Sequence, residues 1–331
     1  MTESRGVRAG IRAILANGSG RLKPARRCSA AEARAWYGPR VHDERGATDG
    51  GTPAGCLVCA GTRRRPRFRK GGRAFVACAG CGFTRVEPLP SPEELERHYA
   101  WTYEQGPYAV FAAADHVRTL VARARLAALR PLLGTGPILD VGASTGSFVA
   151  AARAAGVAAE GIERSERAVA LARLHDLPVR LARLEDFAPA APYAAVTAFD
   201  VIEHLLDPGV LLARARAWLA PGGTLALTLP DGRSAAARLL GRAWWFYAPD
   251  DHFHYFDRRT IVVFLARHGF RVAHATSWRK PLPLAYVLAA GAAFYPRLAR
   301  AVAPVAGLAR RLGDPALRLP VGEMLVVAHP A

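Results

Sequence analysis

Residues 138–148, which read ILDVGASTGSF, decide the fold of this chain. Ile138–Val141 is a short apolar run of the kind that forms a buried parallel strand. Gly142 and Gly146 permit a tight turn because neither residue carries a Cβ. Apolar residues recur at helical spacing from Ser147 onward, so a helix is expected directly after the turn. A strand, a glycine turn and a helix N-terminus together predict a cradle for a nucleotide-like cofactor, because free backbone N–H groups point at the ligand.

A carboxylate ends the next predicted strand, Ala158–Glu163, and stands 21 residues beyond Gly142. Such a carboxylate is placed to accept hydrogen bonds from a ribose diol, as in dinucleotide-binding folds. The dinucleotide loop itself needs glycines at two positions that are occupied here by Ser144 and Ser147. The pattern therefore favours a nucleotide-like cofactor other than a nicotinamide dinucleotide.

The same loop also fits G-x-S-x-G, the nucleophile elbow of serine hydrolases, but the segment before it argues against that interpretation. A hydrolase elbow follows several strands of its own sheet, whereas residues 100–137 look helical. After the loop, strands and helices alternate, which predicts an α/β fold with a doubly wound sheet. The later strands are expected at 158–163, 178–181, 194–200, 224–229, 269–276 and 323–328, with helices beginning near Ser147, Ser165, Pro208 and Thr260.

These blocks resemble the class I S-adenosylmethionine-dependent methyltransferases, and within them the ubiquinone-biosynthesis O-methyltransferases. The resemblance covers about two thirds of the chain and implies a Rossmann-like, seven-stranded sheet with S-adenosylmethionine as the cofactor. Ser144 replaces the middle glycine of the family's D-x-G-x-G-x-G loop. The segments that carry the resemblance are D-x-G-x-S-x-G at 140–146, AFDVIEHL at 198–205, LAPGG at 219–223, HFHYF at 252–256 and HGF at 268–270.

The resemblance also implies which residues bind the cofactor. Backbone of the glycine loop would hold its methionine and ribose portions, and Glu163 would take the ribose hydroxyls. Either Glu185 or Asp186 would face the adenine amine, and Asp200 would border the methyl donor. The complete implied set is Asp140, Gly142, Ala143, Ser144, Gly146, Glu163, Arg164, Glu185, Asp186, Asp200 and Val201.

Methyl transfer to an alcohol or phenol requires a base that titrates near neutrality. His204 is the first candidate, His252 and His254 are the next, and Tyr255 is expected to orient the acceptor with its hydroxyl. His268, at a helix end, is expected to be structural. Four aromatic side chains are expected to wall the acceptor pocket: Trp244, Trp245, Phe246 and Phe253.

A metal variant of this site is an alternative. Asp200, Glu203 and His204 form D-x-x-E-H, which is similar to an acidic–histidine cluster that quinone O-methyltransferases use with Mg²⁺. A divalent ion there would bind a phenolate oxygen and lower its pKa. The other interpretation is that Glu203 and His204 only support the catalytic groups.

A second strong pattern lies upstream. Cys56-x-x-Cys59 and Cys78-x-x-Cys81 are separated by 18 residues, which predicts a four-cysteine zinc ribbon. Two disulfides or a redox pair are weaker alternatives, because nothing marks the chain as secreted and a thioredoxin-like βαβ unit is missing around the cysteines. Cys28 is left over as a spare thiol.

The expected organisation has four parts. Residues 1–50 form a mobile basic segment, 51–90 the zinc ribbon, 91–130 a helical linker or cap, and 131–331 the methyltransferase domain with a helical insertion around 282–312. We expect a cytoplasmic protein, because the first residues hold no apolar core of signal length. Prolines and arginines interrupt the apolar insertion, so no transmembrane span is expected, although peripheral membrane contact is an alternative.

Charge supports a rival function. Residues 1–90 carry 18 basic against 6 acidic residues in a chain of net charge +18, so the ribbon is a candidate for RNA binding. A solvated basic face explains the same charge equally well. The Asp-Pro-Pro-Tyr-like motif of many base N-methyltransferases is also missing. We therefore expect O-methylation of a small molecule of the sugar, quinone, phenol or secondary-metabolite type, with RNA methylation and a catalytically silent cofactor-binding protein as alternatives.

Overall fold

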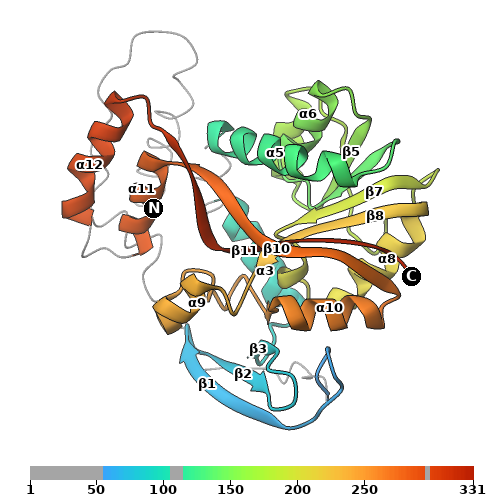
Figure 1. Cartoon of the computed structure of the whole chain (residues 1–331), viewed down its shortest axis with the longest axis horizontal. Coiled ribbons are helices and arrows are strands. Elements are labelled where there is room, and N and C mark those ends of the chain that lie inside the picture. The colour runs from blue at the N-terminus through green and yellow to red at the C-terminus, as the bar shows by residue number, and fades with distance from the viewer. Residues whose placement is uncertain (1–54, 105–114, 295–298) are drawn as a thin grey trace.

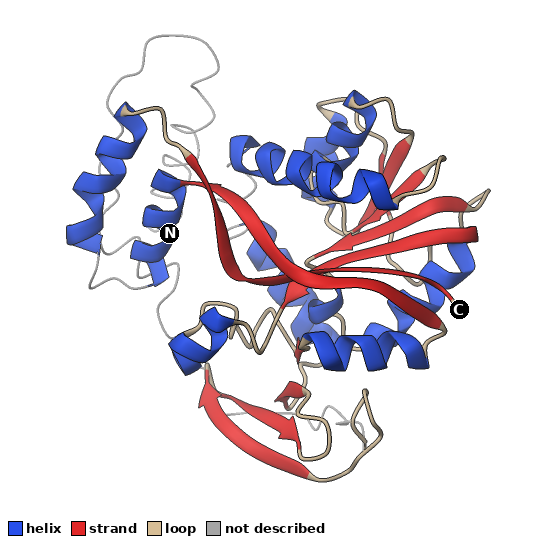
Figure 2. Ribbon diagram, in the orientation of Figure 1, coloured by secondary structure: helices blue, strands red, loops and turns tan. Residues whose placement is uncertain are grey.

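A seven-stranded sheet forms the centre of the computed structural model, which describes residues 55–104, 115–294 and 299–331. The predicted mobile segment 1–50 lies outside these residues. The strand order is β10-β11-β8-β7-β4-β5-β6 (Figures 1 and 2). Strand β11 is antiparallel to both of its neighbours, β10 and β8, and the other six strands run in one direction. The strands are β4 (Ile138–Val141), β5 (Ala159–Glu163), β6 (Val179–Leu181), β7 (Tyr193–Phe199), β8 (Leu219–Pro230), β10 (Phe270–Pro283) and β11 (Ala316–Pro330). The sheet confirms the predicted fold class.

Helices cover both faces of this sheet because the central strands are apolar on both sides. All four residues of β4 are buried, with Ile138 packed on one face and Leu139 on the other. On the Ile138 face lie α5 (Asp115–Leu129), α6 (Ser147–Ala154) and α7 (Glu166–Arg173); on the Leu139 face lie α8 (Pro208–Trp218) and α10 (Arg258–Arg267). The doubly wound arrangement places the carboxyl ends of the parallel strands at one edge, where ligands bind in such folds.

Strands β10 and β11 are longer than the sequence predicts. They continue past the sheet as a twisted pair that carries α11 (Leu284–Phe294) and α12 (Ala299–Arg311) away from the other helices (Figure 1). Prolines 281, 283 and 320 interrupt the apolar alternation of these extensions, which hides them from a sequence pattern. No helix among the residues that the structure describes is both long enough and apolar enough to cross a bilayer.

The cysteine-rich segment forms a second sheet that recruits a strand from the main domain. β1 (Arg64–Lys70), β2 (Arg73–Cys78) and β3 (Thr84–Glu87) are joined by β9 (His254–Tyr255), which pairs with β3 in antiparallel register. The backbone N–H of Val86 also donates to the carbonyl of Phe253 at 2.9 Å. The ribbon is therefore fastened to the aromatic loop that was expected to carry catalytic residues.

Aromatic packing secures this junction. Trp244 is fully buried against Phe75, Tyr247 and Tyr255, and Phe253 is equally buried. The expectation that Trp244 and Phe253 wall an acceptor pocket is thus wrong, because the ribbon packs on this loop and makes both rings part of the core. Trp245 and Phe246 are only partly buried.

Two further helices complete the description. Helix α3 (Pro92–Glu104) links the ribbon to the main domain and begins with a capping box, in which Ser91 Oγ accepts from the N–H of Glu94 and the Glu94 carboxylate accepts from the N–H of Ser91. Helix α9 (Ala235–Leu240) follows β8. Between residues 91 and 130, the described residues lie mainly in α3 and α5.

Candidate active site

The glycine loop after β4 has a conformation that its sequence requires. Gly142 and Gly146 have φ values of +69° and +78°, in the region that favours glycine. A Cβ on Gly142 would lie 2.6 Å from Cγ2 of Val201, so the loop approaches the end of β7 too closely for any side chain. Ser144, at the family's middle glycine, has φ +53° and so takes a left-handed conformation despite its side chain.

This close approach gives a prediction for Gly142→Ala. Left-handed strain together with the clash against Val201 is expected to lower the free energy of unfolding by about 2–4 kcal/mol. Gly156→Ala is the matched control, because Gly156 has φ +77° but its added Cβ would meet nothing within 4 Å. Urea unfolding of both variants separates the clash from the strain; equal losses would show that the contact with Val201 is unimportant.

Glu163 joins the glycine loop to the next strand and helix. Its carboxylate accepts hydrogen bonds from the backbone N–H groups of Ser144 and Ser165, each at 2.9 Å. Burial raises the pKa of Glu163, and these backbone donors oppose that effect. The side chain ends at the carboxyl edge of β5, beside the loop, and each carboxylate oxygen can accept more than one hydrogen bond. This placement fits a carboxylate that meets a ribose diol.

The two aspartates of the implied cofactor set have different surroundings. Asp140 is buried below the loop, accepts from the Thr197 hydroxyl at 2.7 Å, and has its pKa raised by burial to about 7. Asp200, at φ +57°, ends β7 and meets Arg125 at 2.6 Å and Lys280 at 3.5 Å. Burial would raise the pKa of Asp200, but Lys280 and Arg125 hold it below its ordinary value. Asp140 thus supports the loop from below, whereas Asp200 is a fixed carboxylate at the strand edge.

The remaining implied cofactor residues lie around the same edge of the sheet. Ala143 is buried in the glycine loop, and Val201 packs against Gly142. Arg164 follows Glu163 directly and forms an ion pair with Glu96 at 2.5 Å. Glu185 and Asp186 are exposed beyond the carboxyl end of β6. Their role toward an adenine stays a prediction.

Glu203, His204 and His252 come together beyond the end of β7. Their ligand atoms all lie within 4.8 Å of one another, and the two imidazole rings are 4.7 Å apart in an edge-to-face arrangement. Glu203 is 1% exposed, and among the described residues neither of its carboxyl oxygens has a hydrogen-bond partner. Burial, reinforced by the charge of Asp200, raises the pKa of Glu203 well above its ordinary value. Buried carboxyl groups without a hydrogen-bond partner are rare in folded proteins, so Glu203 is a candidate functional residue.

Backbone contacts orient the two histidines. Nδ1 of His252 lies 2.8 Å from the carbonyl of Phe246, and because a carbonyl only accepts, this nitrogen donates and Nε2 is left as the acceptor in the neutral ring. His204 hydrogen-bonds to the backbone of Asp251. Burial lowers the pKa of His204 to about 4 and also lowers that of His252. Both rings are therefore neutral near pH 7, and the pKa of His204 lies below the near-neutral value expected of the base from the sequence.

The structure does not bring His254 to this cluster. Its ring is buried, stacks on Phe83 at 6.0 Å, and has Nε2 3.4 Å from the carbonyl of Leu206. Tyr255 donates its hydroxyl to the carbonyl of His252 at 3.0 Å, so it braces the loop. Pairing of β9 with β3 explains both departures from the predicted roles, because it fixes His254 and Tyr255 against the ribbon. Asp200 is not part of this cluster either, although the D-x-x-E-H pattern predicted it beside Glu203 and His204. The third member of the cluster is His252.

Helix α3 supplies site residues that the sequence did not reveal. His98 Nε2 lies 2.6 Å from the carboxylate of Asp251, next to His252 in the chain. The ring of Tyr99 lies 4.2 Å from the Arg164 guanidinium, and burial raises the pKa of Tyr99, with the charges of Glu163 and other carboxylates acting on it as well. The helix thus lies between Glu163 and the cluster of Glu203, His204 and His252. In the sequence, this helix could have been found from the capping box of Ser91 and Glu94, and its site residues from the adjacent pair His98 and Tyr99.

Comparison with known proteins agrees with this geometry. Residues 113–275 match the family described as "Methyltransferase domain". The chain carries a methyltransferase domain. Within it, 151 residues are 32% identical to the ubiquinone biosynthesis O-methyltransferase of Paramagnetospirillum magneticum, covering 40% of this chain and 60% of that protein. The trans-aconitate 2-methyltransferase of Delftia acidovorans is 34% identical over 36% of this chain and 47% of its own length. The chain thus spans about 60% or less of these curated relatives.

A solved structure with a similar fold is the 1,6-didemethyltoxoflavin-N1-methyltransferase of Burkholderia thailandensis, at 17% identity and a TM-score of 0.47, covering 81% of this chain and 99% of that one. The segment that matches the methyltransferase family, residues 113–275, contains the glycine loop, Glu163 and the Glu203 cluster. Helix α3 and the ribbon precede it, and Lys280, which neutralises Asp200, follows it. The candidate site is therefore completed by residues outside the matched segment.

The four cysteines form a compact group in the ribbon. The Sγ atoms of Cys56 and Cys81 are 3.6 Å apart, those of Cys59 and Cys78 are 3.5 Å apart, and all four lie within 4.8 Å of one another. Thiolates on a tetrahedral zinc ion, with Zn–S bonds of about 2.3 Å, stand about 3.8 Å apart. A disulfide would need about 2.05 Å. The arrangement fits a four-thiolate zinc site and does not fit disulfides.

Proposed function

We propose that this protein is an S-adenosylmethionine-dependent methyltransferase that methylates an oxygen of a small-molecule acceptor, with a structural zinc ion in its ribbon. The observation that carries the proposal is a shared sheet edge. The carboxylate of Glu163, bound to the N–H of Ser144 in the glycine loop, and the Glu203–His204–His252 cluster all lie beyond the carboxyl ends of neighbouring parallel strands.

Each part of this edge has a role in the proposed reaction. The cofactor supplies an electrophilic methyl group, and the backbone around Gly142–Gly146 together with Glu163 would bind and orient it. His204, neutral near pH 7, would accept the proton of the acceptor hydroxyl as the oxygen attacks. Glu203, whose raised pKa favours the protonated form, would donate a hydrogen bond that positions the acceptor. Arg125 and Lys280 hold Asp200 in place beside them.

The residues present do not fit the magnesium variant of this site. Magnesium prefers an octahedron of oxygen ligands, whereas the cluster offers two imidazole nitrogens and one carboxyl group. Asp200, the additional oxygen ligand of the D-x-x-E-H pattern, is already paired with Arg125 and Lys280. We therefore assign no step of the reaction to magnesium.

RNA methylation is less well supported than small-molecule methylation. Phe68 of β1 and Phe75 of β2 are aromatic rings on the ribbon sheet, but they stack on each other at 4.5 Å, and Phe75 is fully buried. Several ribbon arginines are paired with carboxylates, among them Arg64 with Glu87 at 3.1 Å. Neither the rings nor these charges are then available to a nucleic acid strand.

Calorimetric titration with S-adenosylmethionine and S-adenosylhomocysteine tests the proposed function. We expect the wild-type chain to bind both, and Glu163→Ala to weaken binding about 10- to 100-fold, because hydrogen bonds to a charged group contribute about 1.5–3 kcal/mol. Glu166→Ala is the matched control, since Glu166 is an exposed carboxylate in the first turn of α7. A folded wild-type chain that binds neither compound would refute the proposal.

A further inference from the structure

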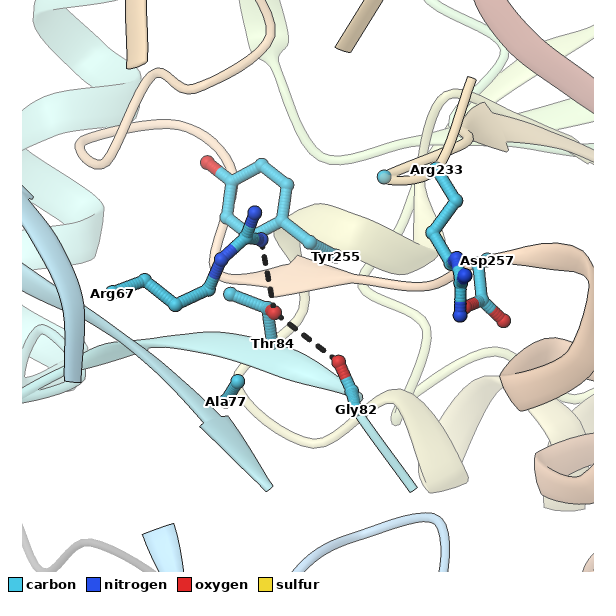
Figure 3. A pocket seen from close by; sticks show the side chains of 8 residues that line it. Arg67, Ala77, Gly82, Thr84, Arg233, Tyr255 and Asp257 are labelled. Atoms are coloured by element: carbon cyan, nitrogen blue, oxygen red, sulfur yellow. Dashed lines mark hydrogen bonds and ion pairs between the residues drawn. The ribbon is translucent and has the colours of Figure 1, made fainter. Parts of the chain in front are cut away.

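A cavity of about 190 Å³ opens at the junction between the ribbon and the methyltransferase domain. None of its lining residues belongs to the glycine loop or to the Glu203 cluster, so it is separate from the proposed site of methyl transfer. Figure 3 shows Arg67 and Arg233 entering it from two different segments of the chain. The lining consists of Arg67, Ala77, Gly82 and Thr84 from the ribbon and of Gly232, Arg233, Tyr255 and Asp257 from the main domain.

Arg67 is held in place by neutral groups. Its Nη1 donates to the hydroxyl of Thr84 at 3.3 Å (Figure 3). The same nitrogen donates to the hydroxyl of Tyr247 at 3.1 Å, and the guanidinium lies 5.8 Å from the centre of the Tyr247 ring. Within the described part of the chain, Arg67 has no carboxylate at ion-pair distance, unlike Arg73 and Arg85 of the same sheet. A guanidinium fixed by hydroxyls keeps its positive charge for another partner.

The opposite wall adds a second cation. Arg233 is 65% exposed at its side chain, and its Nε is 3.9 Å from one carboxylate oxygen of Asp257. The other oxygen of Asp257 accepts from the backbone N–H groups of Arg259 and Thr260 as a helix cap. Nearby, Asp231 is paired with Arg258 at 3.4 Å. Two guanidinium groups against one carboxylate leave the cavity wall with a net positive charge.

Size and chemistry together select the ligand. The cavity is smaller than the pockets of about 300–1,000 Å³ that enclose whole drug-sized molecules, yet it is far larger than the roughly 30 Å³ of one water molecule. Forked guanidinium groups bind phosphate oxygens in pairs. A Cβ on Gly82 would meet nothing within 4 Å, so the backbone leaves open space on that wall. We propose that this cavity binds a phosphate or diphosphate group.

The cavity shares one residue with the catalytic loop. Tyr255 lines it, and the hydroxyl of the same side chain donates to the carbonyl of His252. A phosphate bound here lies against the strand that positions the loop. The phosphate is supplied either by a free anion or by the phosphorylated end of a larger molecule, and these two sources present the same oxygens to Arg67.

Calorimetry of the full zinc-loaded chain with inorganic pyrophosphate tests the proposal. We expect saturable binding that Arg67→Ala and Arg233→Ala each weaken at least 10-fold. Arg69→Ala is the matched control, because Arg69 lies on the same strand, donates to the carbonyl of Gly72 and does not line the cavity. Since Arg233 is an exposed side chain, its loss gives a result even where Arg67→Ala disturbs the ribbon.

A parallel titration with UDP, which carries a terminal diphosphate, distinguishes the two sources. Tighter binding than pyrophosphate indicates the phosphorylated end of a larger ligand, and equal or weaker binding indicates a free anion. Absence of saturable pyrophosphate binding, or equal binding by Arg67→Ala, Arg233→Ala and Arg69→Ala, would overturn the proposal. The S-adenosylmethionine titration of the same samples reports separately on the proposed methyltransferase function.

Discussion

Cys78→Ser is expected to release the ribbon metal and to reduce methyl transfer at least 100-fold, although Cys78 lies outside the matched methyltransferase domain. A structural zinc ion contributes about 10–16 kcal/mol to the folding of small zinc modules, so loss of one thiolate is expected to unfold the hairpin. The consequence for the active site follows from backbone pairing. Strand β3 pairs with β9, and the N–H of Phe253 donates to the carbonyl of Glu203 at 2.8 Å.

The measurement combines zinc content, hydrogen exchange of residues 252–256 and turnover. We expect the Cys78→Ser variant to lack zinc and to exchange the amides of this loop faster. S-adenosylmethionine should still bind, because Gly142 packs against Val201 and Ser144 donates to Glu163, both of which belong to the main domain. Cys28→Ser is the control, since Cys28 is the one cysteine outside the two C-x-x-C motifs. Wild-type turnover by a zinc-free Cys78→Ser protein would show that the ribbon does not position the loop.

Local sequence signals predicted the main sheet well. The strand Ile138–Val141 is found with the same bounds, and Ser165 caps α7 by accepting from the N–H of Ala168. Such features are readable because apolar runs, caps and glycine turns depend on residues a few positions apart. The doubly wound order follows once the strands and helices alternate.

Contacts between distant segments were not readable in the same way. β3 and β9 are about 170 residues apart in the sequence and pair over only two residues, so no local pattern announces them. That pairing turns His254 onto Phe83 and leaves His252 beside His204. Because the histidines of HFHYF are alike in the sequence, only the tertiary structure separates the one in the cluster from the one in the core.

The ion pairs of Asp200 could not be predicted from the sequence either, because they also join distant segments. Asp200 looked like a free carboxylate in D-x-x-E-H, yet Arg125 from α5 and Lys280 from β10 reach it from elements on either side in the sequence. Lysine is rare in this chain and occurs at only three positions, one of which is 280. The presence of a lysine at position 280, where this chain would ordinarily have an arginine, was a signal in the sequence that this residue has a specific role.

His204→Gln is expected to lower kcat about 100- to 10,000-fold, the range usually lost with a general base, while leaving the affinity for S-adenosylmethionine unchanged. The reason is that His204 contacts Asp251 and His252 rather than the glycine loop. His274→Gln is the control, because His274 is exposed on β10. A His204→Gln variant with wild-type kcat would remove His204 from the mechanism.

The pH dependence of the reaction rate tests the role of His204 as the base independently of the His204→Gln variant. An ordinary histidine loses its basic form below pH 6.5, but burial, together with the charge of His252, lowers the pKa of His204 to about 4. The rate should therefore stay level from pH 8 to about pH 5 and fall with a midpoint near pH 4. Stability moves in the same direction: between pH 6.5 and 4 the unfolded chain binds a proton at His204 that the folded chain does not, so the free energy of unfolding decreases as the pH falls through this window. A rate profile with its midpoint at pH 6.5, in a protein that remains folded, would contradict the assignment of His204 as the base.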